Sequence, residues 1–339
     1  MTASLSTLLV GFGGIAHGLA TDKRMANWFP VATHAQAISQ SDSFHLVGIV
    51  DPDPDARKVA EADWNVDAFN SIDAATSLAP DIIVFATPPG KRAAALAKFP
   101  DIKGVFVEKP LGGEDGRRLI ETCNALDIPV QVNFWRRGDE MLQALSNGVL
   151  TDRIGVLQAG HALYGNGLAN NGSHLIDMIR MLLGEPTWVQ ALGAVHPLAQ
   201  SPIADDVHVG FVLGFESDAS VSAHPVNFSQ YREVSLDLWG SHGRLALMQE
   251  TLDIRHYDKV ANRGLDGAFE IASDAGTALP STVASALPNL YENLAARING
   301  EALLMSTGES ALKTEAIIEQ ILRSADRRGE RLEILADVS

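Results

Sequence analysis

The first 133 residues alternate short apolar runs with segments of helical periodicity. The apolar runs predict buried strands at residues 7–10, 44–50, 81–86, 104–107 and 129–132. Helices are predicted between them at residues 33–40, 56–62, 71–78, 91–98 and 114–125. Continuous apolar runs are typical of parallel strands covered on both faces. Because strands that alternate with helices form right-handed βαβ units, we predict a doubly wound parallel sheet in domain 1–133.

The pattern changes from about residue 134, where strand-like segments dominate and apolar and polar positions alternate along several of them. These segments are residues 154–163, 188–195, 207–215, 219–226 and 234–238. Alternation indicates one buried and one exposed face, so domain 134–339 is predicted to be α+β with a large, mostly antiparallel open sheet. Helices are predicted at 139–146, 173–183 and 288–299. A last helix at about 307–325 is expected, and it could pack back on the first domain.

Composition narrows the possible partners. The formal net charge of −16 argues against nucleic acid or an anionic membrane as the main partner. No apolar run approaches the ~18 residues needed to span a bilayer, and no Lys or Arg precedes Lys23 to form a signal-peptide n-region. The single cysteine, Cys123, excludes an internal disulfide and indicates a reducing compartment, with an inert, half-buried thiol. We therefore expect a cytoplasmic protein.

A glycine-rich turn follows the first predicted strand, in the spacing Gly11-x-Gly13-x-x-Ala16. Gly11 permits a tight strand-to-helix turn, Gly13 lets the backbone approach a pyrophosphate, and Ala16 lets a helix pack closely on the strand. The N–H groups of a helix that begins here suit the phosphates of a dinucleotide. The turn therefore predicts a Rossmann dinucleotide-binding domain, although such turns also occur without a ligand.

Asp51 ends the second predicted strand, where a carboxylate can accept hydrogen bonds from an adenosine ribose and repel the 2′-phosphate of NADP. The gap from Ala16 to Asp51 exceeds the usual ~20 residues, which indicates an insertion around residues 22–31. The alternative is that Asp51 only begins the turn Pro52-Asp53-Pro54. We assign Asp51 to the ribose, and the predicted cofactor is therefore NAD in preference to NADP.

Two further turns follow predicted parallel strands, Ala86-Thr87-Pro88-Pro89 and Glu108-Lys109-Pro110. Ligands of such sheets bind beyond the carboxyl ends of the strands, where these turns, Gly11 and Asp51 all fall. The ammonium of Lys109 could hydrogen-bond a substrate hydroxyl or carbonyl beside a nicotinamide, and partial burial would ease proton exchange. The alternative is an ordinary surface lysine.

His174 lies near the start of the predicted helix 173–183, in Asn170-Asn171-Gly172-Ser173-His174. Histidine can exchange a hydroxyl proton near neutral pH, and a helix N-terminus favours its neutral form. Asn170 and Asp177 could share a face with it if the helix reaches back that far. The alternative is that an asparagine caps the helix and that His174 and Asp177 form a structural pair.

No metal site is predicted, since the remaining histidines show no ligand spacing. The sequence also contains no G-x-S-x-G elbow and no phosphate loop that ends in Gly-Lys-Ser/Thr, which argues against a serine hydrolase or an NTPase.

Taken together, the GFGGIA turn, Asp51, the turn at 86–89, Glu108-Lys109-Pro110 and the helix that carries His174 resemble the glucose–fructose oxidoreductase / inositol dehydrogenase (Gfo/Idh/MocA) family. The resemblance covers nearly the whole chain. It implies NAD(P)-dependent oxidation or reduction of a hydroxyl or keto group on a sugar, polyol or sugar nucleotide. Lys109 and His174 are then the catalytic pair, and the open sheet is the interface of a homo-oligomer, a dimer or tetramer.

The resulting site assignments are as follows. Expected cofactor contacts are Gly11, Phe12, Gly13, Gly14, Ile15, Ala16, Asp51, Ala86, Thr87, Pro88, Glu108 and Lys109. Expected substrate contacts are Lys109, Arg136 (with its neighbour Arg137), Tyr164, Asn170, Asn171 and His174.

Three features depart from the family pattern. Asn170 stands where many members have an aspartate, and an amide cannot stabilise an imidazolium. Gly90-Lys91-Arg92 stands where a histidine often follows the turn at 86–89, and the insertion after Ala16 could form a lip over the cofactor with Trp28 as a contact. Two other functions stay open: an NAD-dependent glycosidase of the same fold, and a non-catalytic dinucleotide or sugar sensor.

Overall fold

The computed structural model describes residues 4–198 and 201–334, and the chain divides into two compact units. Unit 1 comprises Met1–Asp139 and Ala284–Leu312, and unit 2 comprises Glu140–Val283 and Lys313–Ser339. The helix α10 (Gly308–Asp326) begins in unit 1 and continues into unit 2. Among the described helices, none is both long and apolar enough to cross a bilayer.

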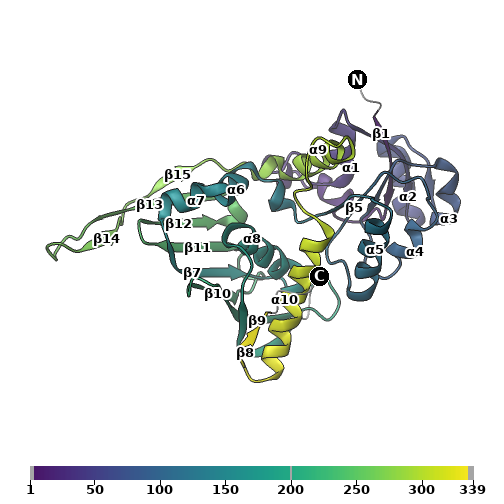
Figure 1. Ribbon diagram of the computed structural model, residues 1–339. Helices are drawn as coiled ribbons and strands as arrows, with labels where there is room; N and C mark the ends of the chain where they lie inside the picture. Colours follow the sequence, from purple (N-terminus) through teal and green to yellow (C-terminus); the bar gives the residue numbers. More distant parts are fainter. Residues whose placement is uncertain (1–3, 199–200, 335–339) are drawn as a thin grey trace. The chain divides into compact units, whose positions relative to one another are not determined.

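Unit 1 is built on a six-stranded parallel sheet in the order β3-β2-β1-β4-β5-β6. Its strands are β1 (Leu5–Val10), β2 (Phe44–Val50), β3 (Ala68–Phe69), β4 (Ile82–Phe85), β5 (Gly104–Val107) and β6 (Val130–Val132). Strands β1 and β5 of this sheet are labelled in Figure 1. All residues of β4 and β5 are buried, because helices cover both faces of the sheet. The predicted doubly wound parallel sheet is confirmed.

The helices of unit 1 are short and mostly follow the predicted positions. They are α1 (His34–Gln40), α2 (Pro54–Trp64), α3 (Ile72–Ala75), α4 (Arg92–Leu96), α5 (Gly113–Ala125) and α9 (Ala286–Ile298). Short 3-10 turns complete the unit at Gly18–Thr21, Met25–Asn27, Thr76–Leu78 and Trp135–Gly138, and the turn Val283–Ser285 spans the boundary between the two units.

Helix α9 belongs to unit 1, which differs from the predicted boundary at residue 133. Its apolar face, which includes Leu290, Tyr291 and Leu294, shares a buried cluster with Ile38 of α1 and Phe106 of β5. The Tyr291 ring stacks on the Phe106 ring at a centroid distance of 4.5 Å. The chain therefore returns to the first sheet after it completes the second, which the hydrophobic pattern of α9 alone does not reveal.

Unit 2 is built on a ten-stranded sheet in the order β14-β13-β12-β11-β7-β10-β9-β8-β16, with β15 paired to β13. Neighbouring strands are antiparallel except β7 and β10, which are parallel. The mostly antiparallel open sheet is thus confirmed. The strands are β7 (Leu157–Tyr164), β8 (Trp188–Pro197), β9 (Val207–Gly214), β10 (Ser220–Pro225), β11 (Ser235–Gly240), β12 (Gly243–Met248), β13 (Asp253–Ala261), β14 (Phe269–Ile271), β15 (Thr277–Leu279) and β16 (Leu332–Glu333).

The sheet extends beyond the predicted strands, because β12 to β16 follow the last predicted segment. Strand β12 forms a hairpin with β11 through Ser241-His242, which lacks the Asn-Gly or Asp-Gly pair that marks such turns in a sequence. Residues Leu245, Ala246 and Leu247 are consecutive and buried, so the alternation that identifies a half-buried strand is absent there.

Helices pack on one face of this second sheet. They are α6 (Glu140–Ala144), α7 (Leu150–Ile154), α8 (Ser173–Leu183) and most of α10, with a π-helical turn at Leu145–Val149 between α6 and α7. Ile179 of α8 and Ile317 of α10 lie in one buried cluster with inward residues of the strands, such as Phe211 and Leu238. Residues on the other face are more exposed, among them Trp239 at 39%.

Candidate cofactor and active site

The glycine turn follows the buried end of β1 as predicted. Gly11 has a φ of +91°, and its N–H donates to the carbonyl of Val50 at 2.8 Å. A Cβ atom at Gly11 would lie 2.8 Å from the carbonyl oxygen of Ala86 and 2.8 Å from Cγ2 of Thr87. Both the backbone conformation and the close approach of β4 therefore require glycine.

Three donors of this turn point away from other protein groups. Among the described residues, the N–H groups of Gly13, Gly14 and Ile15 have no hydrogen-bond acceptor. Gly13 and Gly14 are exposed, and a Cβ atom on either would meet nothing within 4 Å. Free donors beside open space can bind an anion such as a pyrophosphate, so this turn fits a dinucleotide.

The helix predicted to begin at this turn is interrupted, which corrects the sequence analysis. Residues 17–33 leave the turn as two 3-10 segments before α1 begins at His34. The N–H groups of His34 and Ala35 then donate to the carbonyls of Ile15 and Ala16, at 3.1 and 3.0 Å. Helix α1 therefore stacks on the glycine turn as a continuous helix would, with residues 17–33 inserted after its first turn. Trp28 lies in this inserted segment, and 62% of its surface is exposed.

The carboxylate of Asp51 faces the glycine turn. Its Oδ2 atom accepts the N–H of Phe12 at 2.7 Å, and its Oδ1 atom accepts the N–H of Asp53 at 2.8 Å. These bonds fix the carboxylate at the end of β2, and each oxygen retains capacity to accept a further bond. A ribose hydroxyl is a suitable donor for this position.

The turns after β4 and β5 lie at the same edge of the sheet as the glycine turn. The N–H of Ala86 donates to the carbonyl of Val10 at 2.8 Å, which joins the ends of β4 and β1. Thr87 and Lys109 are half-buried, whereas Pro88 is exposed. Because β1, β4 and β5 are parallel neighbours, their carboxyl ends place these residues along one edge.

The carboxylate of Glu108 is directed into the protein. Its Oε1 atom lies 2.9 Å from Nε2 of His34 and also accepts a hydrogen bond from Asn133. Its backbone N–H donates to Phe85, and its carbonyl accepts from Arg92. These protein partners bind Oε1, the backbone N–H and the backbone carbonyl, so Glu108 supports the position of the adjacent Lys109. A direct cofactor contact of Glu108 stays a prediction.

The ionised form of Glu108 is stabilised despite its burial. Burial alone would raise the pKa of Glu108, but the hydrogen bond and charge of His34, the Asn133 amide and the nearby Lys109 ammonium hold it below its ordinary value. The other ring nitrogen of His34 lies 2.7 Å from the hydroxyl of Tyr291. Burial and the charge of Glu108 raise the pKa of Tyr291 well above its ordinary value, so its hydroxyl stays protonated.

In unit 2, His174 lies in the first turn of α8, as predicted. The π-helical turn Leu168–Gly172 runs directly into α8, so the helical backbone does reach back to Asn170. Asp206 holds this turn: its carboxylate accepts the N–H groups of Ala169 at 2.9 Å and Asn170 at 3.0 Å. The position of Asn170 is thus set by a buried aspartate that the sequence analysis did not identify.

Asp177 belongs to a buried ionic cluster. Its Oδ1 atom lies 3.6 Å from a guanidinium nitrogen of Arg180 and accepts a hydrogen bond from Thr314 at 3.4 Å. Arg180 also binds both carboxylate oxygens of Glu185, at 2.6 and 2.7 Å. Charge pairing of this kind fixes α8 against α10 and the segment that follows α8.

The burial of Tyr164 does not favour the predicted substrate contact. Its side chain is 0% exposed, and its hydroxyl donates to the carbonyl of Val209 at 2.7 Å. It points inward because even-numbered positions near the end of β7 face the helices. Arg136 is also buried, at 4% exposed, and its guanidinium lies 4.3 Å from the centre of the Trp135 ring. A substrate contact of Arg136, Asn170 or Asn171 stays a prediction.

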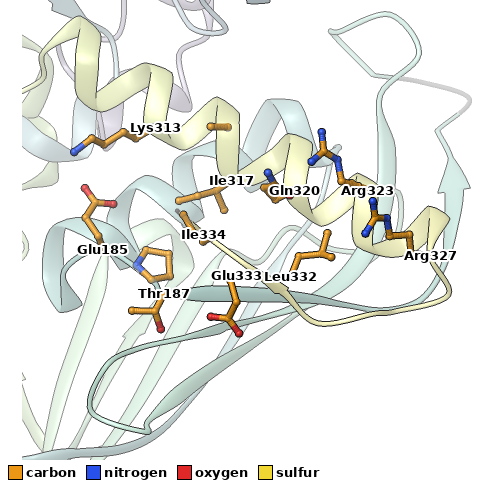
Figure 2. Close-up of a pocket in the computed structure, with 12 residues that line it drawn as sticks. Glu185, Thr187, Lys313, Ile317, Gln320, Arg323, Arg327, Leu332, Glu333 and Ile334 are labelled. Atoms are coloured by element: carbon orange, nitrogen blue, oxygen red, sulfur yellow. The ribbon is translucent and has the colours of Figure 1, made fainter. Parts of the chain in front are cut away.

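A cavity of about 380 Å³ lies in unit 2 (Figure 2). It is lined by one face of α10, by β16 and by residues that follow α8, and none of the predicted catalytic or cofactor residues lines it. Within residues 4–198 and 201–334, no group of three or more His, Cys, Asp or Glu side chains is placed to hold a metal ion.

Comparison with known protein families matches both units. Residues 26–134 match the model described as "Oxidoreductase family, NAD-binding Rossmann fold" of GFO/IDH/MocA. Residues 158–246 match the GFO/IDH/MocA C-terminal domain. Together the two matches cover more than half of the chain, and the first begins inside the inserted segment. No curated protein matches the sequence.

Solved structures share the fold across the whole chain. The WlbA dehydrogenase from Bordetella pertussis, in complex with NADH and UDP-GlcNAcA, has a TM-score of 0.72 at 21% identity and covers 98% of this chain and 100% of its own. A candidate myo-inositol dehydrogenase from Sinorhizobium meliloti 1021 has a TM-score of 0.70 at 22% identity, with the same coverage. A candidate NADPH-dependent oxidoreductase from Desulfitobacterium hafniense DCB-2 has a TM-score of 0.77 at 15% identity and covers 98% of both chains.

The glycine turn with its free donors, the parallel sheet and the two family matches lead to one conclusion. The chain belongs to the GFO/IDH/MocA family of oxidoreductases, and its N-terminal unit is an NAD-binding Rossmann domain.

Proposed function

We propose that the protein is an NAD-dependent dehydrogenase that acts on a hydroxyl or keto carbon of a sugar, polyol or sugar nucleotide. The observation that carries the proposal is the group of free N–H donors at Gly13, Gly14 and Ile15, next to the fixed carboxylate of Asp51. When bound, NAD supplies nicotinamide C4 as the acceptor or donor of a hydride. The remaining chemistry is the transfer of the hydroxyl proton, which side chains of the protein must perform.

We assign the proton-handling roles to Lys109 and His174. Lys109 follows β5 at the carboxyl edge of the sheet and is supported from below by the buried anion Glu108. The ammonium of Lys109 carries three hydrogen-bond donors and is suited to donate one to the substrate oxygen. The imidazole of His174, in the first turn of α8, is then the candidate base.

A preference for NAD over NADP follows from Asp51. A 2′-phosphate at the ribose would place its negative charge beside a carboxylate whose position is fixed by two backbone donors. A fluorescence titration of the purified protein with NADH, and separately with NADPH, tests this assignment. Tight binding of NADH with weak binding of NADPH supports it, a preference for NADPH overturns the role of Asp51, and binding of neither overturns the proposed function.

The substrate class is tested by a turnover screen. WlbA of Bordetella pertussis was solved with UDP-GlcNAcA, and the Sinorhizobium meliloti relative is named for myo-inositol, so UDP-sugars, free sugars and polyols form the panel. NADH formation with one of these compounds supports the dehydrogenase. Release of a free sugar from a glycoside with no net NADH would instead indicate the glycosidase, and binding without turnover would indicate a sensor.

The catalytic role of Lys109 has a matched control, a lysine at the other end of the same strand. Lys103 precedes β5 at the opposite edge of the sheet, where it pairs with Asp81 at 2.7 Å. Lys109→Ala should remove most turnover and leave NADH binding largely intact, whereas Lys103→Ala should leave both unchanged. Turnover of Lys109→Ala within a few-fold of wild type would overturn the assignment.

We also propose that the protein is a homo-oligomer assembled through the second face of the unit 2 sheet. This face carries Leu192 and Trp239, which are 37% and 39% exposed, and the Arg244 guanidinium lies over the Trp239 ring at 4.7 Å. Light scattering measures the mass in solution. Trp239→Glu should shift the protein toward the monomer if this face is the interface, and an unchanged oligomer or a monomeric wild type would exclude it.

A further inference from the structure

Arg92 is a buried cation that the proposed reaction does not use directly. It is the first residue of α4 and is only 2% exposed. An arginine remains protonated in proteins, so its charge must be satisfied inside unit 1. Burial of an arginine is costly unless its donors are paired, and its partners therefore indicate why it is there.

The guanidinium of Arg92 binds carbonyl groups of two turns at the carboxyl edge of the sheet. One terminal nitrogen donates to the carbonyl of Glu108 at 2.8 Å and to that of Pro110 at 2.9 Å. The other terminal nitrogen donates to the carbonyl of Thr87. One side chain thus fixes the backbone on both sides of Lys109 and also the turn after β4.

The backbone of Arg92 is itself anchored. The Oδ2 atom of Asp115, in the first turn of α5, accepts the N–H of Gly90 at 2.9 Å and that of Arg92 at 3.2 Å. The hydrogen bonds to Asp115 therefore fix the start of α4, in addition to the bonds that the Arg92 side chain makes to the carbonyls. The planar fork of a guanidinium can serve several acceptors in fixed directions, which a lysine ammonium at the same place could not reproduce.

We infer that Arg92 is a positioning residue that holds the Thr87 and Lys109 turns in one arrangement and so shapes the nicotinamide half of the cofactor site. This inference rests on the proposed function, with Thr87 and Pro88 as the expected cofactor contacts and Lys109 beside the nicotinamide. These three bonds are made to the Thr87 and Lys109 turns and not to the glycine turn or Asp51, so we expect the loss of Arg92 to affect the nicotinamide half more than the ADP-ribose half.

The two halves of the cofactor can be tested separately by calorimetry with NADH and with ADP-ribose. For Arg92→Lys and Arg92→Met we expect the NADH affinity to fall about ten-fold, because the binding turns lose their preorganisation. The ADP-ribose affinity should stay within about two-fold of wild type. The matched control is Leu96→Ala, on the same helix, which is 3% exposed and removes core packing instead of the carbonyl contacts. Leu96→Ala should lower the stability of the protein, but it should not change the NADH affinity relative to the ADP-ribose affinity.

The outcomes distinguish this inference from the proposed function. If wild type binds neither NADH nor ADP-ribose, the proposed function fails. The inference is overturned if wild type binds both ligands and the Arg92 variants lose affinity for NADH and ADP-ribose equally. It is also overturned if the variants keep wild-type affinity for both ligands, and in either case Arg92 has only a structural role.

Chemical rescue provides a second readout that does not require turnover. Arg92→Ala leaves space at the buried carbonyls, and ethylguanidinium added at millimolar concentration should restore NADH affinity. Ethylammonium, which lacks the planar fork, should not restore it, and neither compound should act on Leu96→Ala. Equal rescue by both cations, or rescue by neither while the variant remains folded, would contradict the guanidinium contacts as the reason for the loss.

Discussion

The Nε2 atom of His34 lies 2.9 Å from the Oε1 atom of Glu108, and both residues are buried. His34 belongs to the helix that resumes after the inserted segment, and Glu108 immediately precedes Lys109. The contact connects the helix that supports the glycine turn with the strand end that carries Lys109. The two parts of the predicted cofactor site therefore share one buried hydrogen-bond network.

Glu108→Gln should destabilise the protein at neutral pH. The pKa of Glu108 in the folded protein lies below its ordinary value of 4.5, so its ionisation stabilises the fold above that value. We expect the free energy of unfolding to fall by about 1–3 kcal/mol at pH 7. The loss should shrink as the pH falls from 4.5 through the lower folded pKa, where wild type also becomes protonated. Urea unfolding at several pH values measures it, with Glu121→Gln, which is exposed, as a control expected to change stability by less than about 0.5 kcal/mol.

Alanine substitutions at two glycines of one turn should have different effects. Gly11→Ala places a Cβ atom 2.8 Å from the Ala86 carbonyl in a left-handed conformation, so it should lower thermal stability. Gly13→Ala meets nothing within 4 Å and should leave stability unchanged, yet it should weaken NADH binding because the methyl group fills the space for the pyrophosphate. Thermal unfolding and NADH titration check both variants. Full NADH affinity in a folded Gly13→Ala protein would contradict this placement of the pyrophosphate.

Asp51→Asn should reduce the discrimination between NADH and NADPH. The amide removes the negative charge that opposes a 2′-phosphate, and its oxygen can still accept one of the two backbone N–H bonds. We expect the ratio of the two dissociation constants to fall by about ten-fold or more, which corresponds to ~1.4 kcal/mol. Parallel titrations with both cofactors measure the ratio. Asp53→Asn, on the neighbouring turn, should leave it unchanged, and an unchanged ratio for Asp51→Asn would exclude the ribose assignment.

Cys123 should resist thiol reagents in the native protein. Its side chain lies on α5 and is 0% exposed, so it is fully buried and not half-buried as the sequence analysis expected. Burial raises the pKa of the thiol to about 12, and little reactive thiolate forms near pH 8. Labelling with an aromatic disulfide reagent should be slow in buffer and complete in denaturing urea. Rapid labelling of the folded protein would contradict the packing of α5.

The sequence by itself determined the class of fold and the location of the glycine turn. Apolar runs at β1, β4 and β5 and alternation at β9 and β11 are local properties, so they identified the parallel and antiparallel sheets directly. Gly11 is also readable, because its need for a positive φ comes from the turn that follows the strand. Asp51 and Lys109 could be placed at one edge, since the carboxyl ends of parallel strands always meet there.

Only the tertiary structure decided which side chains support these positions. The polar atoms of Tyr164 and Glu108 bind Val209 and His34, which are distant in the chain and could not be identified as partners from the sequence. Arg92 and Asp206 carry no local signal, because their roles consist of bonds to backbone groups of other turns. The return of α9 to the first unit depends on packing between residues more than 150 positions apart, as in the pair Gln131 and Leu290. Such contacts arise when the chain closes on itself, and local periodicity does not encode them.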